Sequence, residues 1–370
     1  MFKKLHDKIG NEQKCGYEKA MKARRRFVAM ILTLSIILIL TVVIAISLGQ
    51  VKISPFEAYK ILMHNIFNIS FGDGIELSKG AHFDIIWNIR FPRVLLAMFI
   101  GAGLSICGAT MQAVVQNPLA DPYILGISSG ATLGATFAIL IGASGIFMGA
   151  GVALWAGIGA MIAAFMVIVL SNAKGKMTPV KLILSGVVVN AACYAFTNFI
   201  IYIGANAEGI KSVTFWNMGS LAAAKWNNIL LPIIAVGIGI ILILFQLRAL
   251  NTMLLGDEAA VTLGLNLNKY RWVIMAGTSL ITATMVASCG TIGFVGLIVP
   301  HIIRSLTGSD HRKLIPLCIL CGAIFMVVAD TFARILIKNS EIPIGIITSL
   351  VGAPLFMYLM IRSSYGFGDK

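Results

Sequence analysis

Ten long apolar stretches, separated by shorter polar segments, dominate the hydrophobic pattern of the chain. A helix needs about 20 mostly apolar residues, at about 1.5 Å each, to cross the roughly 30 Å hydrocarbon layer of a membrane. Each stretch therefore predicts a membrane-spanning helix, although the eighth is short and contains Pro300, so we expect it to be broken or packed deeply against protein. The predicted spans are residues 27–48, 91–115, 123–141, 147–170, 182–203, 229–247, 272–289, 293–306, 314–337 and 344–361.

The composition agrees with this pattern and excludes most other classes of protein. Hydrophobic residues make up 58% of the 370 residues, the mean hydropathy is +0.91, and only 12% of the residues are charged. A soluble protein of this size cannot bury so much apolar surface in one core, and a disordered chain needs low hydrophobicity. Soluble enzymes, nucleic-acid-binding proteins and disordered proteins are thereby excluded. The chain is predicted to be an all-α polytopic membrane protein with about ten transmembrane helices.

The positions of lysine and arginine indicate how the spans are oriented. The formal net charge is +14. With a cytoplasmic N-terminus, 20 of the 29 Lys and Arg residues fall in cytoplasmic segments and nine in external ones, which is the distribution that the positive-inside rule requires. We expect both termini in the cytoplasm, with a basic extension over 1–26, a membrane domain over 27–361 and a tail over 362–370. The first span is too long for a cleaved signal peptide. The basic excess indicates topology and contact with anionic lipids rather than a nucleic-acid partner.

Small residues are spaced regularly within the predicted helices. Gly126, Gly130 and Gly134 lie four apart, as do Gly101, Ser105 and Ala109. Small residues allow helix backbones to approach closely in a membrane, so the pattern predicts a tightly packed bundle. The six cysteines are scattered through apolar stretches and do not suggest a disulfide framework.

The sequence contains none of the common catalytic motifs. It has no G-x-x-x-x-G-K-[ST] phosphate-binding loop, no H-E-x-x-H and no G-x-S-x-G. The five histidines are dispersed, and His301, beside Pro300, is better explained as a hydrogen-bonded structural residue than as a ligand. We therefore expect no catalytic residue, no metal site, no cofactor bound by this chain and no enzymatic activity of its own.

Acidic residues are scarce within the predicted spans. Asp330 and Arg334 lie four apart near the outer end of the ninth span, where one helix face can pair them. Carriers driven by protons or sodium ions usually place acids near the middle of the membrane. Their scarcity argues against the main alternative, an ion-coupled secondary transporter, and suggests that energy comes from another subunit. A membrane-embedded enzyme is a weaker alternative, because no catalytic groups cluster.

A polar segment between the sixth and seventh spans, residues 248–270, carries a second kind of signal. Residues 257–263 can form a short helix that Gly264 would end. An exposed short helix between two spans has no task within the membrane, so we expect it to contact a cytoplasmic partner.

Five sequence motifs together make the chain resemble a known family. It is similar, over about residues 30–361, to the transmembrane permeases of ABC importers for ferric siderophores, haem and cobalamin, the FecCD family. The motifs are Arg90-Phe-Pro-Arg93, Gln116-Asn-Pro-Leu-Ala-Asp-Pro122, Gly290-Thr-Ile-Gly-Phe-Val-Gly-Leu-Ile-Val-Pro-His301, Asp310-His-Arg312 and Pro343-Ile-Gly345.

This resemblance implies an architecture and a set of partners. It implies the type II ABC importer permease architecture in a bacterial cytoplasmic membrane, with two permease copies, here expected as a homodimer, around a central pathway. Two ATPase subunits, which hold the ATP and Mg, dock from the cytoplasm, and an extracytoplasmic binding protein delivers the cargo. A ferric siderophore is favoured as cargo because such permeases are frequent in the family, while haem and cobalamin stay open.

The resemblance also assigns candidate site residues. Arg90, Arg93 and Arg334 match positions that contact acidic residues of the binding protein, and an arginine fork suits a carboxylate. Contact with lipid headgroups, or pairing of Arg334 with Asp330, is the alternative for these arginines. The family's ATPase-coupling segment matches 248–270, and its central positions are Asp257, Glu258, Ala259, Ala260 and Gly264.

A gate is the last implied site. Asn117, Pro118 and Leu119, at the cytoplasmic end of the second span, resemble the inner gate of the family. The alternative is a plain turn that ends the helix. A second gate position matches Met177-Thr-Pro-Val180, where this sequence departs from the family pattern and no single residue can be assigned.

Overall fold

The computed structural model describes residues 2–69, 71, 78–142, 151–175, 177–204 and 206–362. In the first helix, side chains are described at Glu18 and from Met21 onward. Residues 147–150 of the fourth predicted span and residues 363–370 of the predicted tail lie outside the described part.

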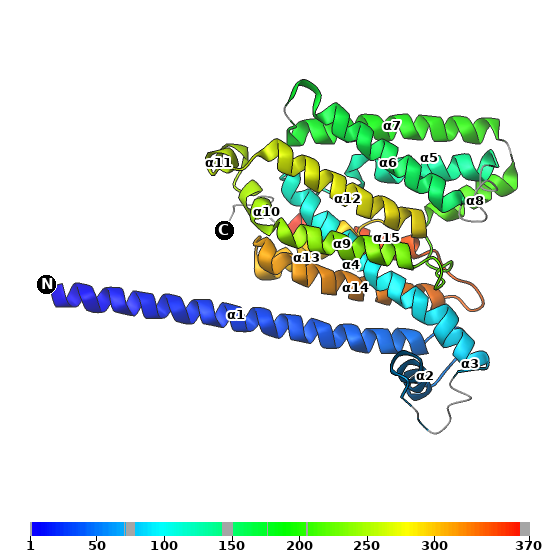
Figure 1. The fold of residues 1–370 in the computed structure, drawn as a ribbon, viewed down its shortest axis with the longest axis horizontal. Helices are drawn as coiled ribbons and strands as arrows, with labels where there is room; N and C mark the ends of the chain where they lie inside the picture. Colours follow the sequence, from blue (N-terminus) through cyan, green and yellow to red (C-terminus); the bar gives the residue numbers. More distant parts are fainter. Residues whose placement is uncertain are drawn as a thin grey trace.

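Every regular element in the described part of the chain is a helix (Figure 1). The elements are α1 (Phe2–Ser47), α2 (Pro55–Phe67), α3 (Ala81–Phe83), the π-helix η1 (Asp84–Arg90), α4 (Phe91–Val114), the 3-10 helix η2 (Pro122–Leu125), α5 (Ile127–Leu140), α6 (Gly151–Ser171), the 3-10 helix η4 (Ala173–Gly175), α7 (Pro179–Ile203), α8 (Ala207–Asn217), α9 (Leu230–Phe245), α10 (Leu247–Met253), α11 (Asp257–Thr262), α12 (Leu267–Cys289), α13 (Val295–Thr307), α14 (His311–Ile335) and α15 (Ile344–Arg362).

The ten predicted spans each coincide with one of these helices, which confirms the all-α membrane fold. Six described helices are long and apolar enough to cross a membrane, and α9 with α10 forms a seventh candidate that is bent by 62°. The other three predicted spans correspond to the shorter apolar helices α5, α13 and α15.

Polar caps set the starts of the helices that begin at the end of the bundle where α10 and α11 lie. The side chain of Thr178 accepts a hydrogen bond from the Lys181 amide, 3.3 Å away, and Pro179 occupies the first helical position of α7. Asn266 caps α12 in the same way at 3.2 Å, and Asp310 caps α14 at 3.0 Å. Each cap satisfies a backbone amide that has no partner within its own helix.

Helix α4 forms the centre of the bundle and packs mainly against α14 and α13 (Figure 1). Of the 18 most apolar consecutive residues in the span that contains α4, 83% are buried inside the bundle. A Cβ at Gly101 would lie 2.1 Å from the Gly322 carbonyl oxygen, and one at Gly108 would lie 1.8 Å from that of Gly296. The predicted close helix packing is therefore present, because only glycine permits these backbone contacts.

The third predicted span, 123–141, was wrong in one respect: it is not a single helix. Gly126, with φ +69°, separates the 3-10 turn η2 from α5, and only α5 continues to residue 140. The segment between α4 and η2 returns into the bundle, because a Cβ at Gly296 would lie 2.8 Å from both the Leu104 carbonyl oxygen and Pro122. Leu104 is near the middle of α4, so this loop reaches the middle depth of the bundle.

The irregular backbone at this depth is satisfied by protein. The Tyr123 hydroxyl donates to the Ile292 carbonyl at 3.1 Å and accepts from the Ile292 amide at 3.3 Å. Non-helical backbone is tolerated inside a membrane only where such partners exist. The 3-10 turn η2, which precedes α5, and the segment before α13 therefore meet inside the bundle.

Asp121 is the second departure from the sequence-based expectation. Its position in the chain places it in a loop between spans, whereas the structure places it next to Pro122, deep in the bundle and half-buried. Its carboxylate accepts a hydrogen bond from the Tyr123 amide at 2.9 Å. The bundle interior therefore contains an acid that the sequence analysis did not locate.

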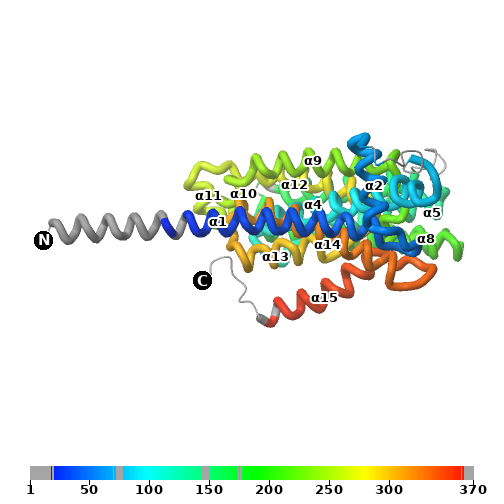
Figure 2. The backbone as a smooth tube through the Cα atoms, turned by 90° about the horizontal axis from the view of Figure 1, so that it is seen from below, coloured from blue at the N-terminus to red at the C-terminus, as the bar shows by residue number. Residues whose placement is uncertain are grey.

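The periphery contains the helices with the most exposed apolar surface. Helix α1 runs along α14 (Figure 2), and none of the 18 most apolar consecutive residues of α1 is buried. Helices α10 and α11 lie at one end of the bundle, and α2 and α8 lie at the other (Figures 1 and 2). The two sets of helices lie at opposite ends, and we name these ends the cytoplasmic end and the outer end after the sequence-based prediction of sides.

Candidate functional site

The predicted short helix in the 248–270 segment is present as α11, and its boundaries follow from two glycines. Gly256, with φ +95°, precedes Asp257, and Gly264, with φ +84°, follows the last turn. The Gly264 amide donates to Val261 and the Leu265 amide donates to Ala260, at 2.9 and 3.0 Å, as is typical of a helix ended by a left-handed residue.

The five coupling residues predicted in this segment differ in what they contact. Ala260 is fully buried and holds α11 against the bundle, Ala259 is half-buried, and Glu258 and Gly264 are exposed. Asp257 faces inward, and its side chain is 36% exposed.

Large apolar side chains are exposed around α11. Leu255, Val261 and Leu263 are each at least 60% exposed, at the end of the bundle rather than along its lipid-facing sides. Together with Glu258 they form a mixed surface that suits a protein partner better than water.

The Asp257 carboxylate joins α11 to two other parts of the bundle. Arg271, on α12, donates to both carboxylate oxygens, at 2.7 and 3.0 Å. The Gln116 side-chain amide donates to the same carboxylate at 2.8 Å and to the Met253 carbonyl at 3.0 Å. The Arg271 guanidinium, which is 1% exposed, also donates to the Met177 carbonyl at 2.7 Å.

The predicted gate residues form the turn that directly follows Gln116. Gln116 has φ +53° and ends α4, and the side chain of Asn117 accepts from the Leu119 amide at 2.9 Å. Asn117, Pro118 and Leu119 are all half-buried. This geometry fits a gate and fits a helix-ending turn equally, so the gate stays a prediction.

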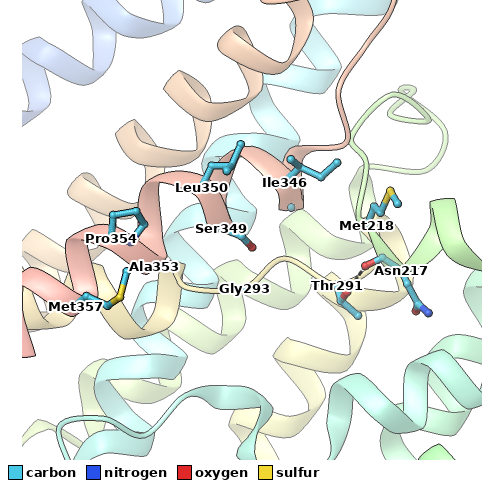
Figure 3. A pocket seen from close by; sticks show the side chains of 11 residues that line it. Asn217, Met218, Thr291, Gly293, Ile346, Ser349, Leu350, Ala353, Pro354 and Met357 are labelled. Carbon is cyan, nitrogen blue, oxygen red and sulfur yellow. Dashed lines mark hydrogen bonds between the residues drawn. The ribbon is translucent and has the colours of Figure 1, made fainter.

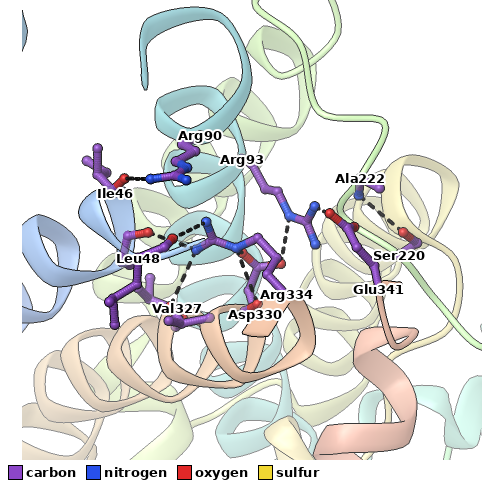
Figure 4. Close-up of polar contacts among 12 residues, drawn as sticks. Ile46, Leu48, Arg90, Arg93, Ser220, Ala222, Val327, Asp330, Arg334 and Glu341 are labelled. Atoms are coloured by element: carbon purple, nitrogen blue, oxygen red, sulfur yellow. Dashed lines mark hydrogen bonds and ion pairs between the residues drawn. The ribbon is translucent and has the colours of Figure 1, made fainter. Parts of the chain in front are cut away.

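At the outer end, two of the three predicted docking arginines hold the end of α1 (Figure 4). Arg90 donates to the carbonyls of Ile46 and Ser47, at 2.8 and 2.7 Å. Arg334 donates to those of Ala45 and Leu48, at 3.0 and 3.2 Å. The last carbonyls of a helix have no partner of their own and carry partial negative charge, so two guanidinium groups stabilise this terminus.

The predicted pairing of Arg334 with Asp330 is confirmed, and a third arginine joins it. Arg334 Nε lies 3.1 Å from Asp330 Oδ2, and Arg93 Nε donates to Asp330 Oδ1 at 2.8 Å. Arg93 also donates to Glu341 at 2.8 Å (Figure 4). We call these side chains, with Arg90, the outer arginine cluster.

The outer arginine cluster is largely inaccessible within this chain. Arg90, Arg93 and Arg334 are only 5%, 6% and 4% exposed. These values favour internal pairing over contact with lipid headgroups. Contact with a binding protein stays a prediction, and it would have to use the one partly open pair, in which the Glu341 side chain is 43% exposed.

A cavity of about 580 Å³ lies beside α15, and the sequence did not indicate it as a site (Figure 3). Its polar side chains come from Asn217, Thr291 and Ser349, and none of the described residues that line it is titratable. The Gly345 amide donates to the Met218 carbonyl at 3.1 Å and closes one end. Such a lining can accommodate a large ligand but cannot perform acid–base chemistry. The remaining lining residues are Gly293, Ile346, Leu350, Ala353, Pro354 and Met357.

Helix α7 carries an exposed polar stripe, which the sequence analysis missed although its spacing was readable. Asn190, Tyr194, Asn198 and Tyr202 lie four apart and are all exposed, Tyr194 by 68% and Tyr202 by 85%. Asparagine is unfavourable against hydrocarbon, because its amide finds no hydrogen-bond partner there. This face of α7 is therefore suited to another protein surface or to a water-filled path.

Metal-binding groups do not come together among the described residues. No set of three or more His, Cys, Asp and Glu side chains in that part of the chain is arranged to hold a metal ion. His301 is half-buried.

Comparison with known proteins gives a consistent result. Residues 37–362 match the model of the FecCD transport family. The chain is 41% identical, over 75% of its length and 73% of the relative's, to the cobalamin import system permease BtuC of Halobacterium salinarum. It is 34% identical to the vitamin B12 import system permease BtuC of Salmonella paratyphi A, over 93% of this chain and 98% of that protein. A solved inward-facing ABC transporter, assigned to the metal-chelate type, superposes with a TM-score of 0.77 at 30% identity, over 90% of this chain and 99% of the other.

Proposed function

The chain belongs to the FecCD transport family of ABC importer permeases, and we propose that its cargo is a bulky metal chelate, with cobalamin as the first candidate. The observation that carries this proposal is the similarity to a vitamin B12 permease over 98% of that protein. Sequence reasoning alone favoured a ferric siderophore, and the similarity to two cobalamin permeases supports our proposal of cobalamin ahead of it. A large, mostly apolar cavity without titratable groups supports a cargo that passes through chemically unchanged.

The transport path is proposed to run between two copies of this chain. The polar stripe on α7 supports this, because Asn190 and Asn198 can form hydrogen bonds with a second copy or with water in the path. Lipid chains offer them no such partner. In a homodimer, the same face of a second copy would cover this stripe, so no other protein is needed.

Energy is proposed to come from separate ATPase subunits, which hold the ATP and Mg and dock at the cytoplasmic end. The sequence has no phosphate-binding loop, and we propose no enzymatic activity for the chain itself. The exposed side chains of Glu258, Val261 and Leu263 support α11 as the docking element. ATP binding would move α11 and change which end of the path is open, a rigid-body transition of a familiar kind.

A substrate-binding protein is proposed to dock at the outer end. An acidic side chain of that protein would replace Glu341 on Arg93, the most open pair of the outer arginine cluster. The chain would lie in a bacterial cytoplasmic membrane with both termini inside. This orientation is testable by labelling a cysteine placed at Lys22 from either side of the membrane.

One experiment tests the cargo directly. The chain is purified with the ATPase subunits and binding protein that associate with it, reconstituted into vesicles, and assayed for ATP-dependent uptake of cobalamin, ferric siderophores and haem. We expect uptake of cobalamin at the lowest external concentration. Uptake of a ferric siderophore or haem alone would overturn the cargo and keep the class of transporter.

An ion-coupled secondary transporter is the second candidate, and one observation specifically favours it. Asp121 lies deep in the bundle and is half-buried, which supplies the intramembrane acid that such a carrier needs. Uptake by the chain alone, driven by an ion gradient and without ATP, would establish this alternative.

A further inference from the structure

We propose that Arg271 is a positioning residue that ties the ATPase-facing helix α11 to both cytoplasmic loops of the predicted gate, an inference that rests on the proposed function. Four segments of the chain meet at the ion pair of Arg271 and Asp257. They are α11 through Asp257, α12 through Arg271, the gate turn through Gln116 and the 177–178 loop through Met177.

The geometry of this junction restricts how α11 can move relative to α12. The two-oxygen contact between Arg271 and Asp257 fixes α11 in both distance and orientation, which a single charge–charge contact would not do. Arg271 is 1% exposed and the Asp257 side chain is 36% exposed, so water and salt reach the pair only from the Asp257 side. A shift of α11 must therefore move Arg271, break the pair, or change which guanidinium nitrogens contact the carboxylate.

The two gate loops are attached on opposite sides of this pair. Gln116 bridges Asp257 and the Met253 carbonyl, and the next residue begins the turn at Asn117. On the other side, the Met177 carbonyl accepts from Arg271, and the Met177 amide donates to Asn268 at 3.2 Å. One displacement of α11 is thus transmitted to both loops.

An unsatisfied atom indicates a second position for the carboxylate. Arg271 Nε is buried and has no hydrogen-bond partner among the described residues. A buried donor without a partner requires an explanation, because leaving it unpaired is unfavourable. In the moved state of α11, the Asp257 carboxylate would engage the Nε edge of the same guanidinium, which keeps the pair intact while the loops change position.

The test compares Arg271→Lys and Gln116→Ala with Arg24→Lys, which makes the same conservative change at an exposed position on α1, outside the 248–270 segment. Lysine keeps the charge but cannot form the fork. In vesicles that contain the chain with its ATPase, we expect cargo moved per ATP hydrolysed to fall at least fivefold in the first two variants and to be unchanged in the control.

A gate measurement separates coupling from folding. Spin labels on Val180→Cys, at an exposed position beside the 177–178 loop, report the distance between the two copies with and without ATP. We expect ATP to shift this distance in the wild type and in Arg24→Lys, and to leave it unchanged in Arg271→Lys and Gln116→Ala.

The outcomes distinguish this inference from the proposed function. If the wild type does not associate with an ATPase, the proposed function fails. If it associates and transports, and Gln116→Ala and Arg271→Lys both couple normally, the role of Arg271 is wrong. If Arg271→Lys does not fold, Gln116→Ala alone decides, because it removes only the link to the gate turn.

A second cavity, independent of this junction, lies at the cytoplasmic end between α1 and the neighbouring ends of α13 and α14. Its volume is about 310 Å³. Three cationic side chains, Lys22, Arg26 and Lys313, line it together with apolar ones. The apolar lining residues include Phe27, Met30 and Leu306.

The arrangement of these side chains is amphiphilic. Lys22, Arg26 and Met30 lie four apart and share one face of α1. Phe27 begins the first apolar stretch, so the cations lie at the predicted membrane boundary and the apolar side chains lie beyond it. We infer that this cavity binds a phospholipid with an anionic headgroup, with the phosphate at the cations and an acyl chain against the apolar side chains.

Two acids lie near the cavity along the chain: Glu18, four residues before Lys22 on α1, and Asp310, which precedes α14. Burial raises the pKa of Asp310, but hydrogen bonds from the Arg312 amide and Asn251, with the nearby cations Arg312 and Lys313, bring it below its ordinary value overall. Asp310 is therefore ionised at neutral pH and already engaged as the cap of α14. In the described part of the chain, no ion pair occupies Lys22, Arg26 or Lys313.

Native mass spectrometry of the purified protein with phosphatidylglycerol or phosphatidylcholine tests this site. The triple variant Lys22→Gln/Arg26→Gln/Lys313→Gln removes the cavity cations. The matched control is the triple variant Arg24→Gln/Arg25→Gln/Arg312→Gln. It removes exposed cations from the same turns of α1 and from the first turn of α14. We expect at least tenfold preference for phosphatidylglycerol in the wild type and the control, and less than twofold in the cavity variant.

Two results would overturn the lipid site. Equal loss of preference in both triple variants would show a diffuse basic surface rather than a site. Competition by millimolar inorganic phosphate would show a site for a soluble phosphate compound, whereas a lipid held also by its acyl chain would not be displaced.

Discussion

Replacing Asp330 by Asn tests whether the outer arginine cluster braces the fold. Asp330 is fully buried and lies between Arg93 and Arg334. Removing one partner of a buried ion pair costs about 3–5 kcal/mol, because the remaining charge is left uncompensated. Unfolding entropy of roughly 2.1 cal/mol/K per residue converts this, for a chain of this length, to a drop in Tm of about 4–6 °C.

The assay is thermal unfolding of the purified protein in detergent, with Glu341→Gln as the matched control. Glu341 contacts the same Arg93, but its side chain is 43% exposed, so its removal should cost at most about 1 kcal/mol, or about 1 °C. A Tm for Asp330→Asn that is no lower than that of Glu341→Gln would refute the bracing role. Docking of the binding protein, as the sequence alone suggested, would then be the remaining role proposed for these arginines.

Three further predictions concern the bundle, the energy source and the path. Gly108→Ala should abolish most monodisperse protein in size-exclusion chromatography, since its Cβ would lie 1.8 Å from a backbone oxygen. Gly277→Ala, with open space around it, should behave as the wild type. Equal yields of the two variants would contradict the close packing of α4. Asp121→Asn should keep ATP-driven uptake. Loss of uptake in this variant, together with a fall in wild-type uptake when the proton gradient is collapsed, would favour the ion-coupled alternative. Tyr194→Cys should form a disulfide-linked dimer in membranes treated with oxidant, and exclusively monomeric protein would argue against α7 at the interface between copies.

Sequence patterns predicted the local features of this molecule well. Each of the ten apolar stretches coincides with a helix, and only the third is divided, because a membrane span depends on length and hydropathy, which are properties of one segment. The Asp330–Arg334 pair and the end of α11 at Gly264 were also readable, because both depend on residues within one or two helical turns.

Features that depend on distant segments were not readable. The break at Gly126 lies within an apolar stretch, where hydropathy cannot distinguish a 3-10 turn from an α-helix. The depth of Asp121 follows from contacts of its loop with α4 and α13, which no local pattern encodes. Arg93 and Asp330 are 237 residues apart, so their pairing, and with it the burial of the predicted docking arginines, emerges only from the packed helices.

The central claim is that this chain moves cargo with energy supplied by a separate ATPase. It is tested most directly by uptake into two sets of vesicles, one with the chain alone under an imposed proton or sodium gradient, and one with the chain, its ATPase and its binding protein under ATP. The account predicts uptake only in the second set, dependent on ATP hydrolysis. Accumulation of cargo in the first set, without any ATPase, would contradict it.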